Sequence, residues 1–265
     1  MKLTAVVSTY NRPHLLPRTI ACFEAQQYED RAMVIYDDGG QYIPADCSDG
    51  EIHLGPRIVL ISTRKREPAL GRKRNQNVAH AEEFFPDTEA IVCVDDDDLF
   101  LPWHFSASAA ALSVAPWSRP SQVLMGRVFG EHWLFQPHLT GCREDPTKNR
   151  MFHPAWAIRL DAFKSVGGYP DNESGMEDKT LMLKMEEAGV QDADYLEMGF
   201  GPGYIYNWGE NNISGMLNRK ISEDGSHAWN KLGRAGLEPA ELDEWVPPFD
   251  LNCPTIAPVV RQRPF

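Results

Sequence analysis

The chain has 265 residues, 42% of them hydrophobic, which suits one large α/β domain or two small ones and excludes global disorder. Asp and Glu outnumber Lys and Arg by 38 to 26, and the net charge of −12 argues against a protein that coats itself in nucleic acid. No apolar stretch has the length of a signal peptide or a transmembrane helix, and the five cysteines form no CxxC pair, so we expect a cytoplasmic protein with reduced thiols.

Strands and helices are predicted to alternate through the first 115 residues. Apolar, β-branched runs predict strands at 3–9, 32–36, 57–63 and 90–94, and helical periodicity predicts helices over 13–26 and from Gly71 onward. Such alternation indicates βαβ units and a mainly parallel sheet. Because ligands of open α/β sheets bind at the carboxyl ends of strands, the polar residues that follow these strands should share one crevice.

The second half is less regular. Residues 121–130 suggest a strand, residues 160–168 a short helix that ends in two glycines, and a further helix should begin near Glu177. That helix has an apolar stripe of Leu181, Met185 and Ala188. Residues 236–265 are rich in proline, and we predict an extended tail wrapped over a single domain.

An acidic run ends the strand at 90–94, in the stretch "AIVCVDDDDLFLP". Four adjacent carboxylates repel one another, and hard cations such as Mg²⁺ and Mn²⁺ prefer such oxygen ligands. In an extended segment, Asp95 and Asp97 would point to one side, and Asp96 and Asp98 to the other. The alternative is a solvated acidic loop with a helix cap, but the position after a buried strand favours a metal site.

Three cations, Arg72, Lys73 and Arg74, open the predicted second helix. Cations there oppose the helix dipole, at a cost of about 0.3–1 kcal/mol each when exposed. A bound diphosphate would reverse that cost, because the helix amides and the cations would then act together on it. The alternative is that these side chains extend into water.

Two further carboxylates, Glu177 and Asp178, fall in the first turn of a predicted helix. The helix dipole alone favours acidic residues at this position. An acidic residue at the mouth of the same crevice could also accept a proton from an attacking hydroxyl.

Five motifs, taken in order, resemble the family 2 glycosyltransferases of the GT-A fold. They are TYNRP at 9–13, DDG at 37–39, G…RN…A at 71–79, DDDD…P at 95–102 and GGYP…ED at 167–178. The resemblance covers about residues 3–210 and implies a Rossmann-like, mainly parallel central sheet flanked by helices. It divides the expected domain, 1–235, into a nucleotide-binding half of about 1–115 and an acceptor half of about 116–235.

The resemblance also implies roles for individual residues. Asp38 would contact the nucleobase, Asp95 would bind the ribose or the metal, and Asp97 would coordinate Mn²⁺ or Mg²⁺. Asp178 matches the catalytic base, with Glu177 beside it. The remaining residues expected around the nucleotide are Thr9, Tyr10, Arg12 and Arg74.

Two later residues are candidates of a different kind. Many GT-A enzymes add a late histidine to the metal, and His227 is the only histidine after the last motif. Trp208, in "YIYNWGENNISG", is a candidate for stacking against an acceptor sugar.

The expected reaction is metal-dependent, inverting transfer of a sugar, such as a hexose, from a nucleoside-diphosphate donor to an acceptor hydroxyl, with a UDP-sugar as the first choice. The acceptor stays open among polysaccharide, lipid-linked glycan, protein and a hydroxymethylated base in DNA. Absence of a membrane helix argues against a processive membrane synthase. Two alternatives are a metal-dependent phosphoesterase or nuclease, which needs ligands for a second metal, and a degenerate transferase that only binds a nucleotide or glycan.

Overall fold

The structure is a computed structural model that describes residues 1–129, 132–140, 150 and 152–207. In chain order its elements are β1 (Leu3–Thr9), α1 (Leu16–Glu24), β2 (Arg31–Asp37), β3 (Asp49–His53), β4 (Ile58–Thr63), α2 (Leu70–Phe84), β5 (Ala90–Asp95), β6 (Leu99–Phe100), α3 (His104–Val114), β7 (Trp117–Ser118), β8 (Gln122–Phe129), β9 (His132–Leu139), the 3₁₀ helix η1 (His153–Ala155), β10 (Ala157–Arg159), α4 (Leu160–Ser165), α5 (Glu177–Glu187), β11 (Asp192–Ala193), the 3₁₀ helix η2 (Tyr195–Met198) and β12 (Tyr204–Asn207).

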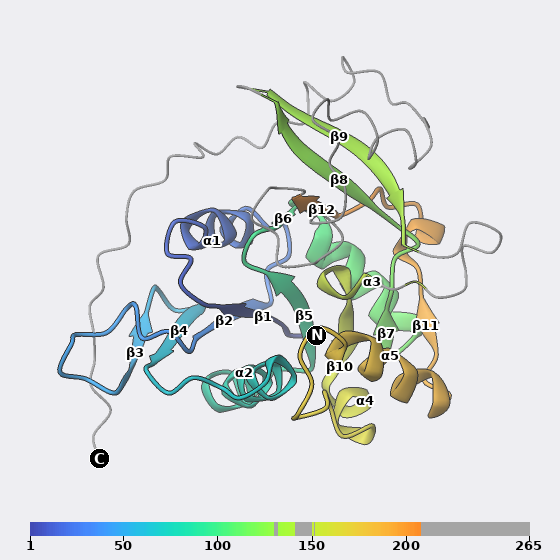
Figure 1. The fold of residues 1–265 in the computed structure, drawn as a ribbon. Coiled ribbons are helices and arrows are strands. Elements are labelled where there is room, and N and C mark those ends of the chain that lie inside the picture. Colours follow the sequence, from blue (N-terminus) through green and yellow to red (C-terminus); the bar gives the residue numbers. More distant parts are fainter. Residues whose placement is uncertain (130–131, 141–149, 151, 208–265) are drawn as a thin grey trace, which may run out of the picture.

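A large central sheet has the strand order β11-β7-β10-β5-β1-β2-β4-β3 (Figure 1). Its middle is parallel, because β1 pairs in parallel with both β2 and β5, and β2 pairs in parallel with β4. The strands β3 and β10 run antiparallel to their neighbours β4 and β5. The expected mainly parallel α/β sheet is therefore confirmed.

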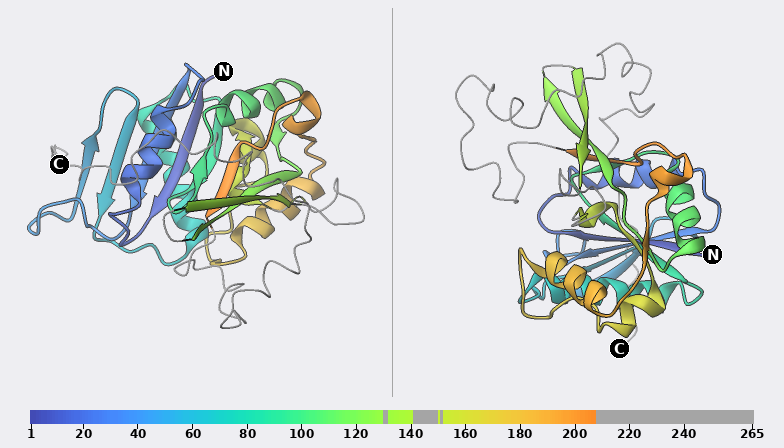
Figure 2. Two further views of the ribbon diagram at one scale, coloured as in Figure 1. Left: turned by 90° about the horizontal axis from the view of Figure 1, so that it is seen from above. Right: turned by 90° about the vertical axis from the view of Figure 1, so that its right-hand side faces the viewer.

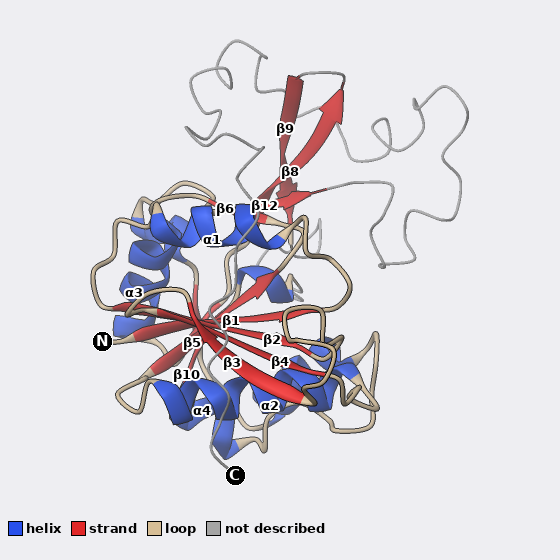
Figure 3. Ribbon diagram, turned by 90° about the vertical axis from the view of Figure 1, so that its left-hand side faces the viewer, coloured by secondary structure: helices blue, strands red, loops and turns tan. Residues whose placement is uncertain are grey.

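Helices cover both faces of this sheet, with α1 and α3 on one side and α2 and α4 on the other (Figure 3). In β1, Leu3, Ala5 and Val7 face the core beneath α1 and α3, whereas Val6 joins the core beneath α2 and α4. Because both faces are covered, these strands are apolar at nearly every position, as is usual for buried parallel strands.

A second, smaller sheet has the order β6-β12-β8-β9 and was not expected from the sequence. Only β8 falls on a predicted strand. It pairs with β9 as an antiparallel hairpin, from Gln122 opposite Leu139 to Phe129 opposite His132. Figure 2 shows this hairpin projecting beyond the layers of the central sheet.

Several element boundaries differ from those predicted. The helix α1 begins at Leu16 and not at residue 13, so the proline in its first turn is Pro17. The helix α2 begins one residue before Gly71, and the short strand β3 was missed. In α5 the predicted stripe is correct for Leu181 and Met185, which are fully buried, but wrong for Ala188, which is exposed at the end of the helix.

No helix in the described part of the chain is long and apolar enough to cross a bilayer. Among the cysteines, Cys22, Cys47 and Cys93 are buried, and Cys22 and Cys93 are free thiols. Cys142, Cys253 and the expected tail at 236–265 lie outside the described residues.

Candidate active site

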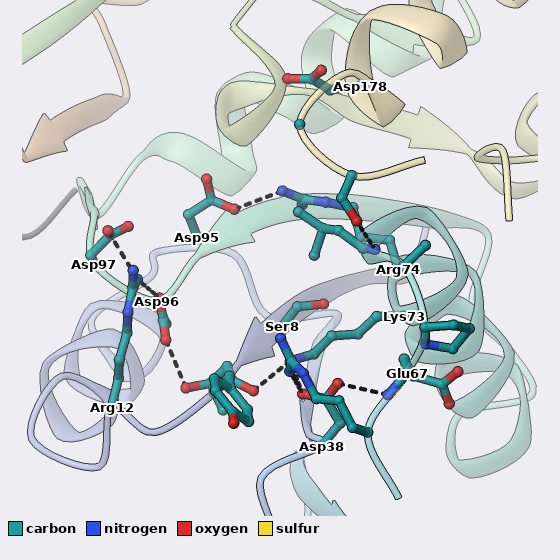
Figure 4. A pocket seen from close by; sticks show the side chains of 18 of the residues that line it. Ser8, Arg12, Asp38, Glu67, Lys73, Arg74, Asp95, Asp96, Asp97 and Asp178 are labelled. Carbon is teal, nitrogen blue, oxygen red and sulfur yellow. Dashed lines mark hydrogen bonds and ion pairs between the residues drawn. The ribbon is translucent and has the colours of Figure 1, made fainter. Parts of the chain in front are cut away.

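A cavity of about 950 Å³ lies where β1, β2 and β5 end, and the beginnings of α2 and α5 close it. Figure 4 shows Asp95, Asp96 and Asp97 on one flank, Asp38 with Lys73 on another, and Asp178 across from both. The predicted site residues that line this cavity are Thr9, Tyr10, Arg12, Asp38, Arg74, Asp95, Asp97 and Asp178. The expected crevice at the strand ends therefore exists.

The four aspartates do not alternate as an extended strand would. β5 ends at Asp95, and the next residues form a turn. Asp96 points into the protein, where it accepts hydrogen bonds from Thr9 Oγ1 at 2.7 Å and Arg12 at 2.8 Å. The prediction that Asp98 shares the side of Asp96 was wrong, because the turn rotates Asp98 back towards Asp95 and Asp97.

Asp95, Asp97 and Asp98 form the carboxylate cluster, with one oxygen from each lying within 4.8 Å of the others. Two ligands of one Mg²⁺ or Mn²⁺ ion lie at most about 4.2 Å apart, since each sits about 2.1 Å from the metal. Small side-chain rotations would therefore let these three oxygens share a cation. Asp98 was not among the predicted ligands, because its role depends on the turn.

Burial and the neighbouring charges of Asp95 and Asp96 raise the pKa of Asp97 to about 6, although the nearby Arg12 opposes this rise. Arg12 donates to Asp97 at 3.0 Å as well as to Asp96. The Arg12 guanidinium does not cancel the combined effect of burial and the neighbouring carboxylates on the pKa of Asp97. A divalent cation would supply the missing positive charge.

Asp38 lies at the opposite flank with its side chain fully buried. It accepts hydrogen bonds from Lys73 Nζ at 2.5 Å, from the backbone amide of Glu67 at 3.1 Å and from the Arg66 guanidinium. Lys73 also donates to the carbonyl oxygen of Thr9 at 2.6 Å, which ties α2 to the end of β1. Burial lowers the pKa of Lys73, and its bond with Asp38 opposes that shift.

The three cations at the start of α2 point in different directions. Arg72 is exposed and lies 3.3 Å from Glu67, whereas Lys73 is buried against Asp38. Arg74 lies between two carboxylates, 3.2 Å from Asp95 and 3.4 Å from Glu177. The alternative in which all three extend into water therefore holds only for Arg72.

The first amides of α2 are already used by the protein. Leu70 N donates to Ser174 Oγ and Gly71 N donates to the carbonyl oxygen of Glu173, both at 3.0 Å. The expectation that helix amides and cations would act together on a diphosphate is therefore wrong for these two amides, because the loop before α5 occupies them.

The same loop docks on α2 through residues of two predicted motifs. Asn75 donates to the carbonyl oxygen of Tyr169 at 2.8 Å and accepts from its amide at 2.9 Å. A side chain at Gly71 would meet the carbonyl oxygen of Pro170 at 1.9 Å, so only glycine fits there. Gly168 has a φ of +62°, which also favours glycine.

The two acidic residues at the start of α5 differ in exposure. Glu177 is buried, where it accepts a 2.6 Å hydrogen bond from the amide of Gly175 and pairs with Arg74. Asp178 is partly buried and lines the cavity. Burial raises the pKa of Asp178, and the amide of Lys179, which donates to it at 2.6 Å, opposes the rise.

Two predicted residues, His227 and Trp208, lie outside the described residues, so their roles remain predictions. Sequence reasoning missed three residues that shape the cavity, namely Arg66, Glu67 and the buried Asp96. A basic rim that includes Arg66 is visible in the sequence, but its contact with Asp38 depends on a turn that local patterns do not predict.

The family model of Glycosyl transferase family 2 matches residues 4–114, which carry four of the five motifs. We call this part of the chain, residues 4–114, the family 2 segment. No curated protein sequence matches the chain. The family 2 segment ends with α3 and so contains Asp38 and the carboxylate cluster, but not Asp178.

Solved structures extend the likeness beyond the family 2 segment. S. aureus TarS 1–349 matches with a TM-score of 0.50 and 16% identity, over 78% of this chain and 60% of that one. The complex of TarS 1–349 with UDP-GlcNAc matches with a TM-score of 0.55 and 17% identity, over 92% and 70%. The GT-A glycosyltransferase fold expected from the sequence is confirmed. The chain spans 60% of the length of the first of these structures.

Proposed function

We propose that the protein is a metal-dependent, inverting glycosyltransferase that moves a sugar from a nucleoside-diphosphate donor to an acceptor hydroxyl. The observation that carries this proposal is one cavity lined by Asp95 and Asp97 of the carboxylate cluster, by the buried Asp38 and by the partly buried Asp178. A donor of this kind has a base, a diphosphate and a sugar, and a cavity of about 950 Å³ can hold all three.

A UDP-sugar is the first donor to test. TarS was solved with UDP-GlcNAc, and that structure shares the fold of this chain. Asp38 supports the same choice, because an acceptor carboxylate suits the ring N–H of uracil. Tyr10, Thr9 and Arg12 line the path from Asp38 to the carboxylate cluster.

In the proposed mechanism, Asp95, Asp97 and Asp98 would hold Mn²⁺ or Mg²⁺, which would offset the charge of the departing diphosphate. Asp178 takes the proton of the acceptor hydroxyl as that oxygen attacks the anomeric carbon opposite the diphosphate. One displacement inverts the configuration. Burial raises the pKa of Asp178, which makes it a stronger proton acceptor than an exposed aspartate.

Arg74 and Glu177 position the acidic residues of the proposed mechanism. Arg74 connects Asp95 at the end of β5 with Glu177 at the start of α5, so one buried cation orients both acidic groups. A two-metal phosphoesterase gains no support, because the described residues contain one cluster of three carboxylates and no second group of three metal-binding side chains.

The metal assignment is tested with Asp97→Asn and with EDTA, using UDP release from UDP-sugars as the activity and titration calorimetry for Mn²⁺ binding. Both treatments should abolish turnover, and the substitution should weaken Mn²⁺ binding by about 100-fold or more, since even outer-shell changes cost about 10–100-fold. The matched control is Asp87→Asn, an exposed aspartate that pairs with Lys2. Full turnover in EDTA would exclude the metal, and failure to bind any nucleoside diphosphate would exclude a transferase.

A further inference from the structure

Arg66 occupies a particular place in the cavity. It follows β4, its side chain is 54% exposed, and its guanidinium carbon lies 3.6 Å from the centre of the Tyr10 ring. The same guanidinium donates to Oδ1 of the buried Asp38. The exposed Arg66 thus stacks its planar guanidinium on the Tyr10 ring and donates a hydrogen bond to the Asp38 carboxylate.

The other two donors to Asp38, Lys73 and the amide of Glu67, are held in place by the surrounding protein. Lys73 is 4% exposed and is held a second time by the carbonyl oxygen of Thr9, and Glu67 donates through its backbone amide. If Arg66 leaves, Lys73 still compensates the charge of Asp38. Of the three donors to Asp38, Arg66 is therefore the one that can move away while the other two hydrogen bonds stay in place.

A nucleobase with a ring N–H makes the same pair of interactions. Uracil is flat, stacks on aromatic side chains and donates one N–H that suits an acceptor carboxylate. The guanidinium and such a base cannot occupy the face of Tyr10 and the Oδ1 position of Asp38 together. One must displace the other.

We propose that Arg66 is a built-in competitor of the nucleobase, which occupies the base subsite of Tyr10 and Asp38 and must swing out before the donor binds. This inference rests on the proposed function, since it assumes a nucleotide donor. It also predicts selectivity: bases with a ring N–H, such as uracil, replace the lost donor at Asp38, whereas cytosine has no ring N–H in its nucleoside and leaves Asp38 less well satisfied.

The test compares wild type, Arg66→Ala and Arg66→Lys by titration calorimetry with UDP, CDP, uridine and inorganic pyrophosphate in the presence of Mn²⁺. Removing a competitor that fills the site most of the time should tighten UDP binding about three- to tenfold, because the apparent affinity scales with the open fraction. Uridine and CDP should gain by the same factor, because each base must displace the same guanidinium, CDP should bind more weakly than UDP in every variant, and pyrophosphate should not change. Arg66→Lys, which keeps the charge but not the flat group, should fall between wild type and Arg66→Ala.

Arg72→Ala is the matched control. Arg72 is a neighbouring cation with 55% of its side chain exposed, and it pairs with Glu67 rather than with Asp38. Its loss should leave the affinity for uridine unchanged. A change as large as that of Arg66→Ala would assign the effect to general charge and overturn the proposal.

Two outcomes for Arg66→Ala would also overturn it. Weaker UDP binding would mean that Arg66 holds the donor, and unchanged binding of both UDP and uridine would mean that no competition exists. In either case the nucleotide still binds, so the proposed function stands. If none of UDP, CDP and GDP binds to wild type or to Arg66→Ala, the proposed function itself fails, and the proposal that Arg66 competes with the base fails with it.

Discussion

The carboxylate cluster after β5 and the acidic start of α5 both bring aspartates to one cavity, but protein donors satisfy them to different degrees. At the start of α5, the buried Glu177 has Arg74 and the Gly175 amide as partners, and Asp178 has the amide of Lys179. After β5, Arg12 faces both Asp96 and Asp97, and the pKa of Asp97 stays raised. The buried Glu177 is thus held by protein donors, whereas the crowded carboxylates after β5 would gain from a cation.

The largest expected effect is that of Asp178→Asn. Loss of a positioned base should cut the transfer rate by roughly 10²–10⁴-fold, while UDP affinity and stability stay near those of wild type. The asparagine oxygen can still accept from the Lys179 amide, which explains the small effect on stability. Single-turnover rates and titration with UDP measure the two parts.

The anomeric configuration of the product is a second readout for Asp178. A single displacement turns an α-linked donor into a β-linked product. If the configuration were retained, or if Asp178→Asn transferred sugar at the wild-type rate, Asp178 would not be the base.

Glu177→Gln should give the opposite pattern to Asp178→Asn. Arg74 would keep a buried charge with Asp95 alone, and we expect the free energy of unfolding to fall by about 1–3 kcal/mol. Urea denaturation measures this loss, and Glu187→Gln, exposed near the end of the same helix, is the control. An unchanged unfolding midpoint would remove Glu177 from its positioning role.

The smallest expected effect is a pH dependence of Mn²⁺ binding. The folded pKa of Asp97, about 6, is above the ordinary value of 3.8, so the folded protein keeps a proton that the unfolded chain loses, and this group lowers stability as the pH rises from 4 to 6. Mn²⁺ must displace that proton at low pH. Its affinity should therefore be about tenfold weaker at pH 5 than at pH 7.5.

Thermal shift with Mn²⁺ at the two pH values measures this dependence. The gain in melting temperature should be larger at pH 7.5, and Asp97→Asn should lose the difference between the two pH values. An equal Mn²⁺ shift at both pH values in wild type would show that Asp97 does not bind the cation in its ionised form.

Local sequence patterns were sufficient to predict the central sheet and many of the residues that line the cavity. The strands β1, β2, β4 and β5 are apolar runs that end in polar motifs, and parallel pairing brings those ends together. The smaller sheet was not predictable in this way, because β6 has only two residues and its partner β12 begins about a hundred residues later.

The missed site residues have a similar explanation. Asp98 joins Asp95 and Asp97 only because the chain turns after β5, whereas strand geometry alone places it on the other side. Arg66 contacts Tyr10 and Asp38 across the ends of different strands. Such contacts depend on loop conformation, which local sequence patterns do not specify.

The docking of the loop before α5 on α2 has a consequence for engineering. Gly71 and Asn75 belong to the family 2 segment, yet they fit against Pro170 and Tyr169 beyond its end. A chimera that takes the chain after residue 114 from another protein of this fold would therefore pack poorly here unless the residues at positions 71 and 75 come from the same protein. An exchange of the residues after position 114 has to be designed across this contact, and not at the boundary of the family 2 segment.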